Sequence, residues 1–147
     1  MTAIFPTDSL AQLPTCGDPE TKHRIIKFDN RDVRLPEPSP GKALVFVIYK
    51  ESRPQFGTLQ LKFVANNEYK AVLVKNHYSY FEVEPELQRI CVQAKGTLVY
   101  GGQFFTPEAG GTYFFRMGLT IGLRELLPDE GLKLVKETKF ATFEVKE

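Results

Sequence analysis

The chain has 147 residues, with 19 basic and 18 acidic side chains and a formal net charge of +1. Its length indicates one domain, and the near-neutral charge argues against a nucleic-acid partner, which a basic excess would favour. A hydrophobic content of 42% excludes a disordered chain, and no run approaches the roughly 18 apolar residues that a membrane helix needs.

Residues 1–35 are predicted to form an extended N-terminal arm and a linker, and residues 36–147 a separate folded domain. Prolines at positions 6, 14 and 19 interrupt the arm, and alternate prolines in Leu35–Gly41 forbid a helix. The first residues lack the basic and apolar regions of an export signal. Two locations stay open: the cytoplasm, or the periplasm or cell envelope if a signal has been removed.

Short apolar segments separated by turn residues follow. The run Ala43–Tyr49 predicts a strand that is covered on both faces, because a half-exposed strand would alternate. Thr58–Phe63 does alternate, with its leucines and Phe63 inward. Tyr69–Lys75 and Tyr78–Val83 are predicted as further strands, and the connecting turns are expected at positions 66–67 and 76–77.

Alternation is clearest over residues 113–124, which predict one long half-buried strand, bent at Gly118 or Gly122. The glycine pairs at 101–102 and 110–111 and the segment Pro128–Gly131 are interpreted as turns. Residues 132–147 fit both a strand and a helix, and a strand is favoured for the last part. The fold predicted is all-β: a single antiparallel β-sandwich, Greek-key or transthyretin-like in arrangement, with an extended N-terminal arm.

The two cysteines, Cys16 and Cys91, are 75 positions apart, and the two histidines fit no metal-ligand pattern, so neither a metal site nor a cofactor is expected. Alternation along Arg89–Ala94 turns Cys91 away from the main core, towards whatever covers that face of the sheet. The arm that carries Cys16 is a candidate for this cover. A Cys16–Cys91 disulfide and two unrelated reduced thiols both remain open from these residues.

Candidate catalytic residues are few. His23 and His77 have no serine or cysteine placed beside them as a nucleophile. Glu82, Glu84 and Glu86 could supply the paired carboxylates of a glycosidase, but alternate glutamates are more simply the solvated face of a strand and turn. A hydrolase would need a cleft that gathers His77 with Glu82 or Glu84. No enzymatic activity is therefore predicted.

Aromatic residues provide the one binding hypothesis. Tyr78 and Tyr80 are predicted to face away from the main core, Tyr100 precedes a glycine pair, and either Phe104 or Phe105 must point outward. Rings on an outer sheet face can stack on a sugar or flank an added peptide strand. The favoured alternative is that the N-terminal arm covers these rings, in a cluster beneath the disulfide.

Several motifs occur in the order found in a known family: Pro38–Val47, Val64–Tyr69, Ser79–Phe81, Glu84-Pro85 and Glu108–Arg116. In their order and spacing they resemble the bacterial domain-of-unknown-function family 2846, found in envelope proteins and lipoproteins. The similarity covers roughly Pro36 to Phe143. Two features depart from it: Glu84–Leu87 replaces a proline-glycine turn, and the usual export signal is not visible.

This resemblance implies a β-sandwich in the envelope with no assigned activity. Some relatives carry a Cys-Gly pair after a leader, as in Cys16-Gly17, and a later cysteine at the position of Cys91. The resemblance therefore favours a Cys16–Cys91 bridge and an oxidising compartment. We predict a non-catalytic bacterial envelope module with a structural or interaction role, monomeric or weakly oligomeric, whose partner is a protein or envelope component. The alternative is a glycan- or small-ligand-binding module that uses the outward aromatic rings.

Overall fold

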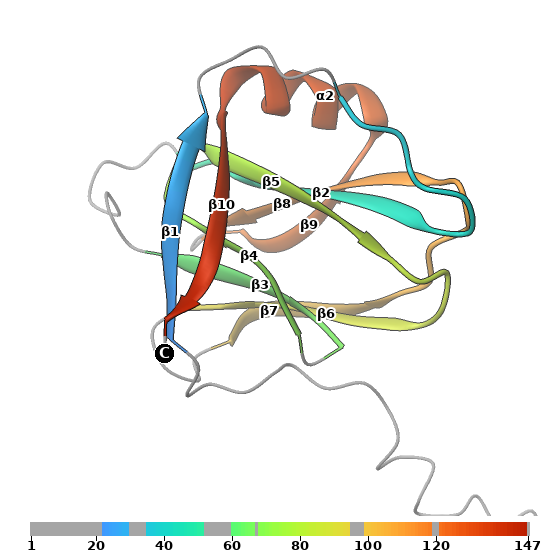
Figure 1. Ribbon diagram of the computed structural model, residues 1–147, viewed down its shortest axis with the longest axis horizontal. Helices are drawn as coiled ribbons and strands as arrows, with labels where there is room; N and C mark the ends of the chain where they lie inside the picture. Colours follow the sequence, from blue (N-terminus) through green and yellow to red (C-terminus); the bar gives the residue numbers. More distant parts are fainter. Residues whose placement is uncertain are drawn as a thin grey trace, which may run out of the picture.

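The protein folds as two packed β-sheets with a helix on one outer face (Figure 1). The computed structural model describes residues 22–29, 35–51, 60–66, 68–94, 99–118 and 121–146. Its elements are β1 (Lys22–Asp29), β2 (Ala43–Tyr49), β3 (Leu61–Ala65), β4 (Glu68–Leu73), β5 (His77–Val83), β6 (Gln88–Gln93), β7 (Val99–Phe105), β8 (Thr112–Gly118), β9 (Gly122–Leu126), α2 (Pro128–Glu137) and β10 (Lys139–Lys146). Strand β1 belongs to a sheet, although the sequence placed its residues in the arm and linker.

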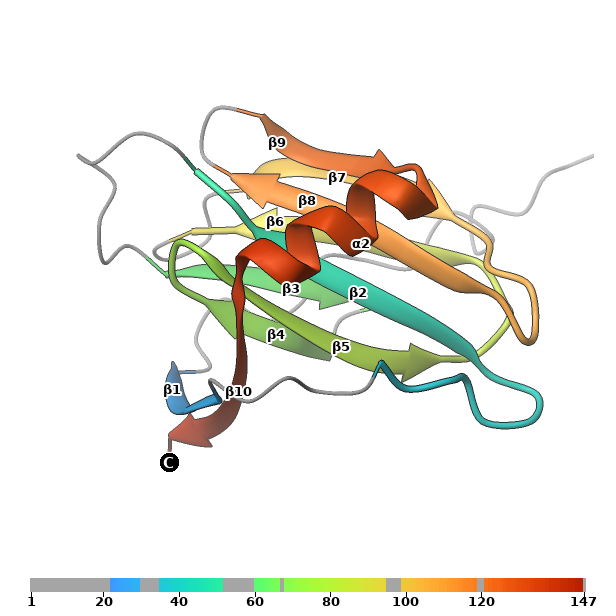
Figure 2. The ribbon, with the colours of Figure 1, turned by 90° about the horizontal axis from the view of Figure 1, so that it is seen from above.

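The first sheet has six strands in the order β1-β10-β5-β2-β8-β9, and the second has four in the order β4-β3-β6-β7. Helix α2 crosses the outer face of the six-stranded sheet, in front of β8 and β2 (Figure 2). This architecture confirms the all-β sandwich. Most strand pairs are antiparallel, as expected, but β2 pairs with β8 and β10 pairs with β5 in parallel. Between the parallel strands β2 and β8, the chain forms β3 and β4 in the four-stranded sheet, β5 in the six-stranded sheet, and β6 and β7 in the four-stranded sheet again.

Strand β2 explains the continuous apolar run in the sequence, because all seven of its residues are buried. Val45, Val47 and Tyr49 face the four-stranded sheet and form part of the core between the two layers. The alternate residues face α2 and form a second core on the outer side of the sheet: Leu44, Phe46 and Ile48. The prediction of a strand covered on both faces is confirmed.

Residues 128–137 form helix α2, so the prediction of a turn at Pro128–Gly131 is wrong. Proline at the first position of a helix loses no hydrogen bond, and Asp129 and Glu130 lie in the first turn, where the helix dipole favours acidic groups. The helix ends at Glu137 and is capped by Thr138, whose hydroxyl donates to the carbonyl of Leu134 at 2.8 Å. Strand β10 follows, which confirms a strand in the last part of the chain.

The alternation over residues 113–124 belongs to two strands, not to the one long strand predicted. Strands β8 and β9 pair as an antiparallel hairpin, with Met117 opposite Leu123. Paired residues of a hairpin point to the same face of the sheet, so the alternation continues although the chain reverses. Gly101 and Gly102 lie inside β7, opposite β6, and do not form the expected turn.

Two of the predicted turns and one predicted core face are confirmed. Asn66 and Asn76 have positive φ angles of 47° and 67°, which asparagine tolerates better than most residues. Leu61 and Phe63 are fully buried between the sheets, as the alternation of their segment predicts. Leu59 and Asn67 lie outside the described residues.

Candidate functional site

Tyr78 and Tyr80, two of the predicted ligand-binding residues, lie on β5 and face α2. Tyr78 is 5% exposed, and Tyr80 is half-buried. The ring centre of Tyr80 lies 5.5 Å from that of Phe46 and 5.3 Å from that of Phe140. These rings belong to the second core, the cluster that also contains Leu132, Leu134 and Val135 of α2. The N-terminal arm was expected to cover them, and its residues 1–21 lie outside the described residues.

Tyr100 and Phe104, the other two predicted binding residues, lie on β7 in the opposite sheet. The side chain of Tyr100 is outside the described part of the structure. Phe104 is 50% exposed, and the guanidinium carbon of Arg89 lies 4.9 Å from its ring centre. The four residues therefore divide between two layers and do not form one aromatic surface.

Cys91 lies on β6 and is fully buried. Its neighbours Ile90 and Val92 point into the core between the sheets, so alternation directs Cys91 to the outer face of the four-stranded sheet. Cys16 lies outside the described residues. Cys91 and the tyrosines of β5 lie on opposite outer faces of the sandwich, so the prediction that they share one covered patch is wrong.

His77 and Glu82 stand near opposite ends of β5. Glu82 lies five positions after His77 along the extended strand, which corresponds to about 16 Å at roughly 3.3 Å per residue. The Nδ1 atom of His77 lies 3.0 Å from the carbonyl oxygen of Lys75, so the ring is held at the turn before the strand. His23 lies on β1, and its side chain is outside the described part of the structure. Glu84 follows the end of β5 and lies further along the chain still, so the structure does not gather His77 with Glu82 or Glu84.

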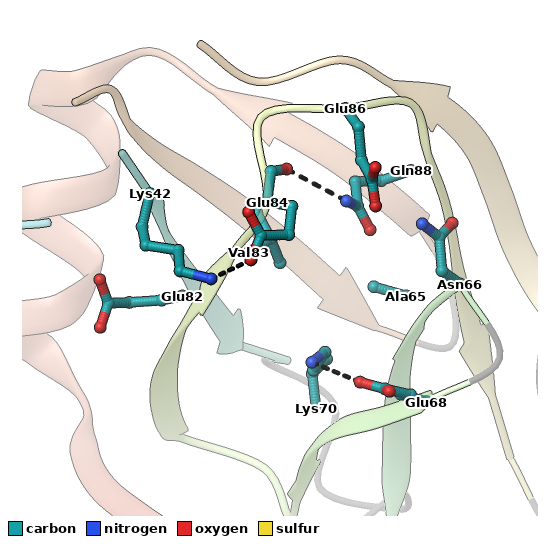
Figure 3. A pocket seen from close by; sticks show the side chains of 10 residues that line it. All are labelled: Lys42, Ala65, Asn66, Glu68, Lys70, Glu82, Val83, Glu84, Glu86 and Gln88. Carbon is teal, nitrogen blue, oxygen red and sulfur yellow. Dashed lines mark hydrogen bonds and ion pairs between the residues drawn. The ribbon is translucent and has the colours of Figure 1, made fainter. Parts of the chain in front are cut away.

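A polar pocket of about 320 Å³ opens at the end of the sandwich where β5 leads into β6 (Figure 3). The lining comes from both sheets. The end of β5, the loop from β5 to β6 and the start of β6 form one part, and the residue before β2, the end of β3 with the residue after it, and the first half of β4 form the rest. Four glutamates and two lysines give the lining a formal charge of −2. The lining residues are Lys42, Ala65, Asn66, Glu68, Lys70, Glu82, Val83, Glu84, Glu86 and Gln88.

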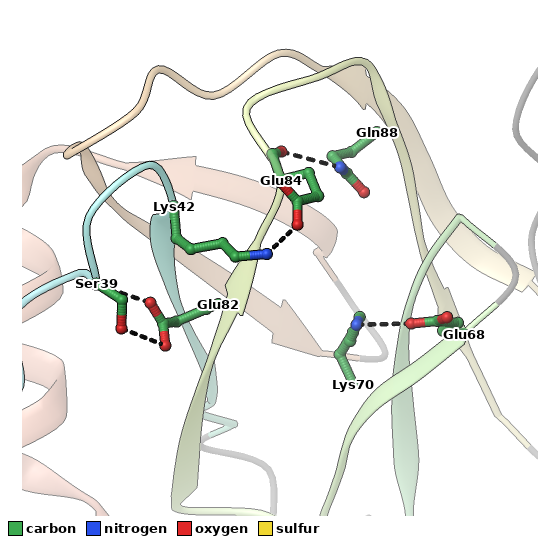
Figure 4. A network of polar contacts seen from close by, with 7 residues as sticks. All are labelled: Ser39, Lys42, Glu68, Lys70, Glu82, Glu84 and Gln88. Atoms are coloured by element: carbon green, nitrogen blue, oxygen red, sulfur yellow. Dashed lines mark hydrogen bonds and ion pairs between the residues drawn. The ribbon is translucent and has the colours of Figure 1, made fainter.

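Glu82 anchors the turn that leads into β2. The N–H of Lys42 donates to the carbonyl of Ser39 at 3.0 Å, and Gly41 has a φ of +77°, so Ser39–Lys42 forms the type II turn that a Pro-Gly pair favours. The carboxylate of Glu82 accepts hydrogen bonds from the N–H of Ser39 at 2.7 Å and from its hydroxyl at 2.9 Å (Figure 4). These bonds hold the pKa of the Glu82 carboxyl below its usual range.

Two ion pairs line the same pocket (Figure 4): Lys42 with Glu84, and Lys70 with Glu68 at 2.7 Å. The hydrogen bond to Glu84 raises the pKa of Lys42, and the hydrogen bond from Lys70 lowers the pKa of Glu68. A general acid needs a carboxyl whose pKa is raised, and the shifts at Glu68 and Glu82 have the opposite sign. Across the described ranges, no group of three or more His, Cys, Asp or Glu side chains could hold a metal ion.

Gln88 is a buried polar residue of the lining, with 4% of its surface exposed. Its Nε2 donates to the carbonyl of Glu84 at 3.2 Å. The sequence analysis considered Glu82, Glu84 and Glu86 but missed Gln88 and the two lysines. No local pattern marks these residues, because they become neighbours only through the folding of the two sheets.

Comparisons with known proteins found no relative. No family model matches the chain, and neither the curated proteins nor the solved structures contain a significant match. In the part of the chain that the structure describes, no helix is long and apolar enough to cross a membrane.

Proposed function

We propose that this protein is a non-catalytic module of a bacterial cell envelope, with a structural or interaction role and a protein or envelope component as its partner. In this proposal a Cys16–Cys91 disulfide fastens the N-terminal arm across the outer face of the four-stranded sheet. The observation that carries the proposal is the complete burial of Cys91 on a face turned away from the other sheet.

Neighbours of Cys91 on the same outer face are also buried. Val64, opposite Cys91 in the sheet register, is fully buried, and Gln93 is 3% exposed. Burial lowers the pKa of Lys62, which pairs with Gln93. A sheet face without a second layer is normally solvated, so these residues require a cover, and the proposal assigns that role to the arm. The described residues include no free cysteine, which agrees with a bridge.

A persistent disulfide supports an oxidising compartment such as the periplasm. The order of sequence motifs, which resembles an envelope family, supports the same location. The separation of His77 from Glu82 along β5 and the lowered pKa of Glu82 favour a non-catalytic role. We do not propose ligand binding by Tyr78 and Tyr80, because both rings pack against Phe46 and Phe140 in the second core.

The proposed bridge predicts that a reductant destabilises the protein. The two cysteines are 75 positions apart, and closing a loop of that length contributes about 4 kcal/mol to the free energy of unfolding in the chain-entropy estimate. Urea unfolding with and without dithiothreitol should show this difference. A Cys16→Ser variant should be as stable as the reduced protein and insensitive to the reductant. Equal unfolding free energies for the oxidised and reduced wild type would refute the proposal.

A further inference from the structure

The polar pocket has a chemistry that the structural role proposed above does not use. We propose that it binds an organic ammonium ion, carried either by a small free amine or by the lysine side chain of a partner. The inference rests on the pocket alone and does not depend on the disulfide or on the envelope location.

Gln88 provides a buried hydrogen-bond acceptor for such a ligand. Its amide nitrogen donates a hydrogen bond to the carbonyl oxygen of Glu84, which fixes the orientation of the side chain. The amide oxygen then has no hydrogen-bond partner in the described part of the chain, and Figure 3 shows the amide within the pocket lining. The side chain of Gln88 is 4% exposed and lines the pocket, so a ligand N–H group placed there could donate a hydrogen bond to this oxygen. The pocket therefore presents an acceptor to a donor-bearing ligand.

The charges of the lining favour a cation over an anion. Both lysines are already paired, Lys42 with Glu84 and Lys70 with Glu68, so an anion would have to displace a carboxylate. Glu86 is exposed and forms no ion pair with any described residue, so it can contact a ligand without breaking an existing bond. The formal charge of −2 adds a field that attracts a cation.

The size and shape of the pocket limit the ligand. A volume of about 320 Å³ lies at the small end of the roughly 300–1,000 Å³ range of ligand pockets. It suits a short aliphatic amine or one lysine side chain. An ammonium group can donate three hydrogen bonds at once, which matches an amide oxygen surrounded by carboxylates.

Titration of the intact protein, followed by NMR chemical shifts of the pocket residues, tests this proposal. The probes are 1,4-diaminobutane, its neutral isostere 1,4-butanediol, the dianion succinate, and an acetylated, amidated Gly-Lys-Gly peptide. We expect saturable shifts for the diamine, the peptide or both, and none for the diol or succinate. Binding of the peptide alone would identify a protein lysine as the ligand, and binding of the diamine alone a free amine. No saturable shift with either amine, or equal binding of the diol, would overturn the proposal.

Variants locate the binding to this pocket. Glu86→Gln removes an exposed charge without disturbing the fold and should weaken amine binding by up to about fivefold. Gln88→Met removes the buried acceptor and should weaken it tenfold or more, with circular dichroism confirming that the variant is folded. Glu125→Gln, an exposed position on β9 outside the pocket lining, is the matched control and should bind like the wild type. Unchanged affinity in both pocket variants would contradict the assignment.

Discussion

Replacing Gly131 by alanine should destabilise the protein, because Gly131 lies where α2 contacts the aromatic face of the six-stranded sheet. A Cβ atom there would lie 2.2 Å from Cγ and 2.5 Å from Cβ of Phe114. Phe114 is not free to move, since its ring stacks on that of Phe46 with the centres 5.0 Å apart. Helix propensity acts in the other direction and favours alanine by about 1 kcal/mol. Overpacking costs about 1–3 kcal/mol, and the cost here should lie near the upper limit because the overlap is with the Cβ and Cγ atoms of Phe114. After subtracting the gain in helix propensity, we expect the free energy of unfolding to fall by about 1–2 kcal/mol.

Urea unfolding followed by far-ultraviolet circular dichroism measures this loss directly, and the melting temperature should fall by about 3–8 °C. Lys133→Ala, at an exposed position of the same helix, is the control and should change the free energy of unfolding by less than about 0.5 kcal/mol. Combining Gly131→Ala with Phe114→Leu should cost less than the sum of the two single changes, because the smaller side chain relieves the overlap. A Gly131→Ala protein as stable as the wild type, or more stable, would show that propensity outweighs the contact and would refute this reasoning.

Three further predictions concern single groups. Burial, and to a lesser extent the nearby Glu51 carboxylate, raises the pKa of Tyr49 to about 12. The folded protein therefore favours the neutral phenol, and the stability that this phenol contributes is complete below pH 10 and is lost as the pH rises towards 12. Tyr49→Phe, which removes a buried hydroxyl without a hydrogen-bond partner among the described residues, should therefore leave stability at pH 7 nearly unchanged and reduce its loss in alkali. The pKa of Glu82 is lowered, so its bonds to Ser39 stabilise the protein above pH 4.5, and this stabilisation is lost in more acidic solution. The urea midpoint should therefore fall less between pH 5 and pH 3 in Glu82→Gln than in the wild type. An equally steep fall would contradict this prediction. Asn66→Ala should lower the free energy of unfolding by about 2–4 kcal/mol. It removes the side-chain hydrogen bonds with Arg89 at 2.7 Å and Leu87 at 3.1 Å, and it places alanine at a positive φ. Asn66→Gly should cost about half as much, because glycine tolerates that φ, and equal losses in the two variants would exclude the φ effect.

The strands were predictable wherever one residue pattern corresponds to one structure. The β2 segment is apolar at every position, and only a strand between two cores explains that in seven residues. The β8–β9 hairpin was not predictable from alternation, because the inward and outward positions stay in phase across its turn. Helix α2 was missed because Pro128 and Gly131 are turn residues in most contexts. Here Pro128 starts a helix and Gly131 allows that helix to approach Phe114.

The functional surfaces were less predictable than the strands, because they depend on which elements cover each sheet. Alternation placed Tyr78 and Tyr80 correctly on the outer side of their strand, but no pattern shows that they join a second core with Phe140 and residues of α2. Alternation also placed Cys91 on an outer face. Only the division of β5 and β6 between two sheets shows that this outer face is not the one that carries Tyr78 and Tyr80. The pocket around Gln88 draws on segments far apart in the sequence, and therefore required the fold.

The proposed bridge between Cys16 and Cys91 is tested most directly by peptide mapping of protein purified without reductant and alkylated under denaturing conditions. We predict that neither cysteine is alkylated and that proteolysis releases one disulfide-linked pair of peptides containing Cys16 and Cys91. Recovery of both cysteines as alkylated, unlinked peptides would contradict the account.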